Sequence, residues 1–106
     1  MTGTTAEVAL SGELDISTYD DALAQLAAAE RSAPEMLVVD LAGLRFVDST
    51  GVRLILSADE RARESGRRLA LRLGDGPARR VFAALGLVDR FEVLDAPEEG
   101  PGQLRP

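Results

Sequence analysis

DLAGLRFVDSTG, residues 40–51, joins a strand-like run to the start of a helix. The run that leads into it, MLVVDL at residues 36–41, is almost continuously apolar, as in a strand that is covered on both faces. Asp48, Ser49 and Thr50 follow, and each of these residue types can accept hydrogen bonds from the first free amides of a helix. The stretch therefore predicts a buried strand that turns directly into a helix.

Strand-like and helix-like segments alternate along the rest of the chain. Further strands are expected at residues 7–10, 69–73 and 91–94. Three helices are predicted. The first begins after Ser17 as its N-cap, the second runs from about residue 50 to 64, and the third ends at Gly86. Successive strand–helix–strand units join parallel strands through right-handed crossovers. The sequence thus predicts an α/β fold with a single-layer, mostly parallel β-sheet of about four strands and crossover helices.

The strand-to-helix turns of such a sheet all emerge at its carboxyl edge, where α/β proteins place their sites. The turns at residues 12–17, 42–50 and 74–77 should therefore lie along one edge, and a local function is expected there. One domain is expected over residues 1–94. Residues 95–106 are acidic and contain Pro and Gly, which predicts a flexible tail.

Composition excludes several chemistries. The 106 residues include no Cys, His or Lys, which removes thiol nucleophiles, the commonest general base and metal ligand, and Schiff-base lysines. Neither a metal nor another cofactor is expected. The net charge of −6 argues against nucleic acid and against anionic membranes as partners. No apolar run approaches the ~18 residues of a membrane span, so a cytoplasmic protein without membrane insertion is expected.

Three segments together resemble the STAS-domain anti-sigma factor antagonists. Residues 12–15 (GELD) followed by residues 40–51 are similar to the signature of that family. Residues 81–91 (VFAALGLVDRF) resemble its third helix and the entry to its last strand. The resemblance covers roughly residues 7–94, with the segments in the same order and at similar spacing.

The resemblance implies a binding module, not an enzyme. In the family, the first hydroxyl of the Asp-Ser-(Ser/Thr)-Gly turn is the phosphoacceptor, which corresponds to Ser49 here. The unmodified protein binds an anti-sigma factor that is also a serine kinase and so frees a sigma factor; phosphorylation ends binding and a serine phosphatase restores it. Asp15 matches an acid at the kinase contact, although a loop acid can equally cap the first helix. Asp48, Thr50 and Gly51 complete the expected partner-binding turn.

Helical periodicity extends this expected surface along the second helix. At 100° per residue, Ser49, Val52, Arg53 and Leu56 form one strip. We expect Leu56 to be half exposed, and Val52 and Leu56 to give the kinase an apolar contact with Arg53 at its rim. Leu56 can also be the shoulder of the core, because single exposed leucines are common.

Other functions stay open. The same fold can serve as the STAS subunit of a membrane transporter or of a larger signalling assembly. A hydrolase with Ser49 as its nucleophile is disfavoured, because the Gly-x-Ser-x-Gly elbow is absent and no His or Lys can activate the hydroxyl. Only residues 1–6 precede the first strand, where the family usually carries another strand. That edge can invite self-association, so a homodimer is left open.

Overall fold

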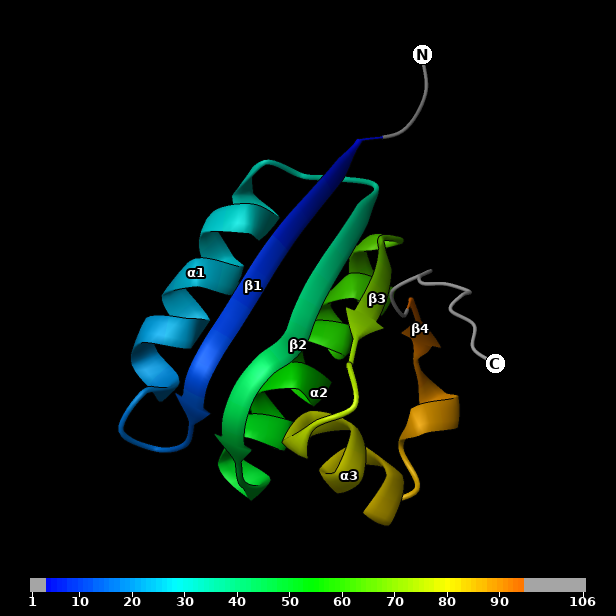
Figure 1. The fold of residues 1–106 in the computed structure, drawn as a ribbon. Helices are drawn as coiled ribbons and strands as arrows, with labels where there is room; N and C mark the ends of the chain where they lie inside the picture. The colour runs from blue at the N-terminus through cyan, green and yellow to red at the C-terminus, as the bar shows by residue number, and fades with distance from the viewer. Residues whose placement is uncertain (1–3, 95–106) are drawn as a thin grey trace.

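The computed structural model describes residues 4–94 and contains one sheet with three helices and a short 3₁₀ helix (Figure 1). All four strands are parallel, in the spatial order β1-β2-β3-β4. This confirms the predicted α/β fold. In chain order the elements are β1 (Thr5–Leu14), α1 (Tyr19–Arg31), β2 (Met36–Val47), α2 (Ser49–Ser65), β3 (Arg68–Arg72), α3 (Pro77–Ala84), η1 (Val88–Arg90) and β4 (Glu92–Val93).

The core lies on one face of the sheet. Because successive side chains of a strand point to opposite faces, Leu37, Val39 and Leu41 of β2 point to the side where α2 lies behind the sheet in Figure 1. Val38 is also buried, but it lies on the other face and is not part of that core. The prediction of a strand covered on both faces is therefore confirmed in this part of β2, although helices cover only one of the two faces.

An ion pair crosses the other face. Arg72 on β3 contacts Glu7 on β1 at 3.4 Å, so the pair spans the middle strand β2. Glu7 is the register partner of Val38, which places the pair over the region of that buried side chain. The aliphatic stem of an arginine can cover apolar surface while its charged end stays in water. The apolar run of β2 is thus covered on its second face by charged side chains and not by a second layer of helices.

The first two strands are longer than the sequence predicted. Pairing between β1 and β2 continues past Gly12 to Leu14 and Val47, with register shifts on either side of Gly12. Gly12 has φ +78°, a left-handed conformation that glycine adopts without strain. Gly12 therefore forms part of a bulge within the strand and does not end it. The carboxyl edge of the sheet consequently begins at Leu14 and Val47.

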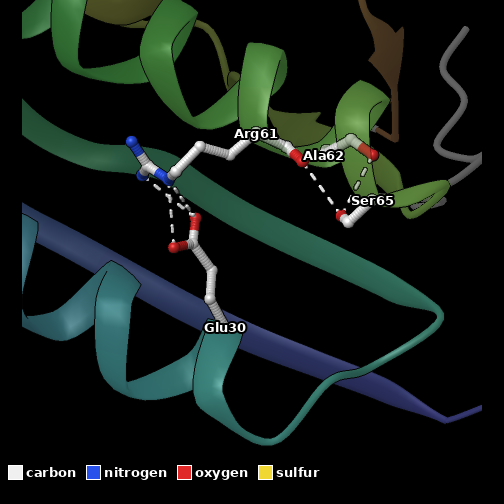
Figure 2. Close-up of polar contacts among 4 residues, drawn as sticks. All are labelled: Glu30, Arg61, Ala62 and Ser65. Atoms are coloured by element: carbon white, nitrogen blue, oxygen red, sulfur yellow. Dashed lines mark hydrogen bonds and ion pairs between the residues drawn. The ribbon is translucent and has the colours of Figure 1, made fainter.

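A bidentate ion pair links helix α1 to helix α2 (Figure 2). Arg61 Nε lies 3.1 and 3.2 Å from the two carboxylate oxygens of Glu30, and Arg61 Nη2 lies 3.0 Å from Oε2. Just beyond it, the Ser65 hydroxyl donates to the carbonyls of Arg61 and Ala62 in the last turn of α2. Both contacts lie in the later turns of the two helices, away from the carboxyl edge of the sheet. Of the two, the ion pair joins α1 to α2, whereas the bonds of Ser65 lie within α2.

Within residues 4–94, no helix combines the length and the apolar character that a membrane crossing requires. The predicted tail at residues 95–106 lies outside the described residues, and its flexibility stays a prediction. So does the division of the chain into a domain and a tail.

Candidate functional site

The ends of β1 and β2 bring two loops together at the carboxyl edge. Leu14 and Val47 are register partners, and the amide of Asp48 donates to the carbonyl of Leu14 at 3.3 Å. The loop that begins at Asp15 and the turn that contains Ser49 are therefore neighbours. This juxtaposition was predicted from the parallel topology alone, because the sequence itself shows no contact between the two loops.

Asp48 is the N-cap of α2. Its Oδ1 accepts hydrogen bonds from the amides of Thr50 at 3.0 Å and Gly51 at 3.2 Å. Ser49 is exposed and is the first residue of the helix. Within residues 4–94 its hydroxyl has no hydrogen-bond partner. Of the three residues that can cap this helix, Asp48 does so, and the hydroxyl of Ser49 is left available for other chemistry.

Gly51 and Val52 are both buried. A Cβ at Gly51 would lie 2.8 Å from both Leu14 Cγ and Val47 Cγ2, so glycine lets α2 start directly against the ends of β1 and β2. Val52 is 4% exposed and belongs to the core. Both residues pack against the sheet in the first turn of α2, and their contact with a partner stays a prediction.

Asp15 organises the first loop. Its Oδ1 accepts hydrogen bonds from the Ser17 hydroxyl at 2.7 Å, the Ser17 amide at 3.0 Å and the Thr18 amide at 3.2 Å. The bond from the Ser17 hydroxyl, supported by the two amides, lowers the pKa of Asp15 below its ordinary value, although desolvation opposes the shift. The N-cap of α1 is Thr18, not Ser17 as predicted, and the side chain of Ser17 instead bonds to Asp15.

A hollow of about 460 Å³ lies between the starts of α1 and α2. Ile16 on its rim is 80% exposed, which is unusual for so large an apolar side chain. Ile16 was not predicted to belong to the site. The sequence does indicate it, as an isolated apolar residue in an otherwise polar loop. The hollow is lined by Ile16, Tyr19, Thr50, Arg53 and Ser57.

A second hollow, of about 350 Å³, lies on the other flank of α2. Leu56 is half-buried there and packs partly against the core, as its position on the helix predicted. Arg53 is exposed and lines both hollows, so it stands on the ridge between them. The residues around this second hollow are Arg53, Leu56, Ser57, Glu60, Leu87 and Arg90.

Residues 4–94 contain no cluster of three or more Asp, Glu, His or Cys side chains that is arranged to hold a metal ion. The site combines the free hydroxyl of Ser49, the ordered carboxylate of Asp15, the exposed side chain of Ile16 and the exposed guanidinium of Arg53. Such a surface suits recognition by another protein.

The family model described as "Mlab, STAS domain" matches residues 1–95, and the chain belongs to this family. The anti-sigma factor antagonist SpoIIAA in its unphosphorylated form is 29% identical and has a TM-score of 0.72, over 92% of this chain and 84% of that one. The phosphorylated form of the Bacillus protein SpoIIAA is also 29% identical, with a TM-score of 0.67 over 92% and 87%. These comparisons confirm the predicted STAS fold.

Two further structures show how widely the fold is used. An anti-sigma factor antagonist from Mycobacterium paratuberculosis is 29% identical, with a TM-score of 0.70 over 85% of this chain and 76% of that one. A sulfate transporter family protein from Wolinella succinogenes has a TM-score of 0.69 over 84% and 75%, but only 14% identity, so the likeness is one of fold. No curated protein sequence matches this chain.

Proposed function

We propose that this protein is an anti-sigma factor antagonist that is switched off by phosphorylation of Ser49. The observation that carries the proposal is that Asp48 and Ser49 have different roles at the start of α2. Asp48 caps the helix, while the adjacent Ser49 hydroxyl is exposed and has no hydrogen-bond partner within residues 4–94. A phosphoacceptor needs this accessibility, because the kinase must approach the hydroxyl oxygen.

The similar structures support the same role. Two anti-sigma factor antagonists, each 29% identical, share the fold of this chain, and one of them was solved both with and without its phosphate. By analogy, the partner is an anti-sigma factor that is also a serine kinase, and a serine phosphatase reverses the reaction. An acidic protein of net charge −6 that acts between cytoplasmic proteins needs neither nucleic acid nor a membrane as a partner.

The exposed and half-buried residues of this surface support the proposal, each with a different contact that it could make. Asp15 uses Oδ1 within its own loop, and Oδ2 accepts no hydrogen bond within residues 4–94, so Oδ2 can meet a cation of the kinase. Thr50 is half-buried beside Ser49, and Leu56 and Arg53 continue the surface along α2. Ile16 adds an apolar anchor at the other side of the first hollow.

Phosphorylation acts on this surface through charge. The kinase transfers the γ-phosphoryl group of ATP to Ser49 Oγ, the hydroxyl proton is released, and ADP leaves. The product carries about −1.5 to −2 charges next to the Asp48 carboxylate. An interface that fits a neutral hydroxyl loses complementarity when an anion of this size replaces it. The fold should survive, because the cap at Asp48 does not depend on Ser49.

The test is to incubate the protein with candidate anti-sigma-type kinases and ATP and to map the modification by mass spectrometry. We expect phosphate on Ser49 and none on Thr50. Calorimetry should then show that Ser49→Ala binds the kinase and that Ser49→Asp binds it more weakly. A phosphate on Thr50 with Ser49 unmodified, or equal affinities of the two variants, would contradict the proposal.

A STAS subunit of a membrane transporter would have the same fold as an anti-sigma factor antagonist but a different partner. The likeness to the Wolinella succinogenes protein, at 14% identity, supports only the fold. The neighbouring genes separate the two functions: an anti-sigma-type kinase beside this gene favours the antagonist, and a lipid-transport permease favours the transporter subunit.

A further inference from the structure

A phosphate on Ser49 would meet a helix start at which the amides of Thr50, Gly51 and Val52 already have acceptors. Asp48 Oδ1 accepts from the amides of Thr50 and Gly51, and the backbone carbonyl of Asp48 accepts from the amide of Val52 at 3.0 Å. Free amides at a helix N-terminus ordinarily stabilise a phosphate. Here three amides of the first turn have acceptors, and the nearest carboxylate is negative. A cation from a side chain would therefore add to the stabilisation of the phosphate.

Arg53 is in position to supply that cation. It follows Ser49 by four residues on α2, and side chains at this spacing lie on the same helix face with Cβ atoms about 5–6 Å apart. An anion placed before the cation at this spacing is the more favourable orientation. Arg53 is exposed, and within residues 4–94 it makes no hydrogen bond or ion pair. Its guanidinium can therefore turn toward Ser49 without breaking a contact.

The other arginines of α2 are engaged elsewhere. Arg61 is held by Glu30 of α1, and Arg63 pairs with Asp59 at 3.0 Å. Arg90, which lines the second hollow with Arg53, contacts Asp59 at 3.3 Å. Arg53 is thus the arginine of α2 whose charge has no counter-ion in the part of the chain that the structure describes.

We propose that Arg53 binds the phosphate of phosphorylated Ser49 and so stabilises the modified state of the protein. This inference rests on the proposed function, because it concerns the product of Ser49 phosphorylation. The guanidinium donates N–H hydrogen bonds to the phosphoryl oxygens, and charge-assisted bonds of this kind are strong. Because Arg53 lines both hollows, its turn toward the phosphate also removes a cation from the surface that the kinase contacts. One modification then changes two features of the interface.

The test uses protein into which phosphoserine is incorporated at position 49 during translation, so that no kinase is needed. The second ionisation of the phosphate is followed by ³¹P NMR as a function of pH. A cation beside the phosphate favours the dianion and lowers its pKa. Arg53→Gln should therefore raise that pKa by about 0.2–0.4 pH unit, the shift that corresponds to a typical i,i+4 ion pair. Arg53→Lys, which keeps the charge, should restore part of the difference.

Two control variants remove the same charge elsewhere. Arg31 is exposed at the end of α1 that points away from the carboxyl edge, and Arg31→Gln should leave the titration close to that of the parent because salt screens distant charges. Arg45 is exposed on β2, four residues before Ser49. A titration that is unchanged in Arg53→Gln, or that shifts more in Arg45→Gln, would overturn the assignment. Failure of every kinase to modify Ser49 would instead contradict the proposed function and leave this measurement intact.

Discussion

Replacing Asp48 with alanine should destabilise the protein far more than replacing its neighbour Ser49. Asp48 Oδ1 accepts two hydrogen bonds from backbone amides, at 3.0 and 3.2 Å. The Ser49 hydroxyl has no hydrogen-bond partner within residues 4–94. Truncation of Asp48 therefore leaves two amides at the start of α2 without their acceptor, whereas truncation of Ser49 leaves every backbone contact in place.

The expected difference follows from the cap. Loss of an N-cap side chain costs about 1 kcal/mol, within a range of about 0.5–2. Loss of a carboxylate at a helix N-terminus adds about 0.3–1 kcal/mol. We therefore expect Asp48→Ala to lower the free energy of unfolding by about 1–2 kcal/mol. Ser49→Ala should cost less than about 0.5 kcal/mol, as for an ordinary surface substitution. In a domain of this size each kcal/mol lowers the Tm by roughly 4–8 °C.

Urea denaturation of both variants, followed by circular dichroism, measures the two free energies. Asp48→Asn is the matched control, because asparagine caps helices about as well as aspartate while it removes the charge. It should recover most of the stability that Asp48→Ala loses. If Ser49→Ala were as destabilising as Asp48→Ala, the serine hydroxyl would have a structural role, and the separation of cap from phosphoacceptor would be refuted.

Three further substitutions test other parts of the site. Gly51→Ala should lower stability by about 1–3 kcal/mol, the usual cost of overpacking, because its Cβ would lie 2.8 Å from Leu14 and Val47; an unchanged Tm would contradict this packing. Asp15 has a lowered pKa when folded, so its charged form stabilises the fold above its unfolded pKa and that stability is lost as the pH falls through the folded value. Below about pH 4 the wild type should therefore lose Tm more steeply than Asp15→Asn, and parallel curves would argue against the shift. Leu56→Ala should weaken kinase binding by about 1–3 kcal/mol and destabilise folding less than that; unchanged affinity with a large loss of stability would place Leu56 in the core alone.

The arrangement of the strands was predictable from sequence because it depends on few, strong signals. Alternating strand and helix segments with short connections leave a parallel sheet as the simple solution, and the turns then meet at one edge. The end of α3 near Gly86 was equally clear, because glycine commonly follows the last turn of a helix, and Gly86 indeed has φ +71° there. The bulge at Gly12 was missed, since whether a strand continues depends on its partner β2 and not on its own residues.

Side-chain orientation at the site was less predictable. Periodicity placed Val52 and Leu56 on one strip, but it could not show how α2 is rotated against the sheet. Contact of Gly51 with the strand ends sets that rotation and buries Val52, while Leu56 stays half-buried. Ile16 escaped notice because it lies in a loop, where no period relates sequence position to exposure. Its 80% exposure follows only from the path of the loop around Asp15.

The direct contact of α2 with the ends of β1 and β2 bears on how quickly a partner could respond to a modification of Ser49. Gly51 leaves no gap between the helix start and Leu14 or Val47, so the backbone around Ser49 has little freedom to shift as a unit. A phosphoryl group at this position changes the charge and side-chain layout of the surface and leaves the scaffold beneath it in place. Under the proposed function, we therefore expect no slow rearrangement of the fold between phosphorylation of Ser49 and its recognition by a partner. The time that a partner needs to respond is then expected to depend on its own rates of association and dissociation.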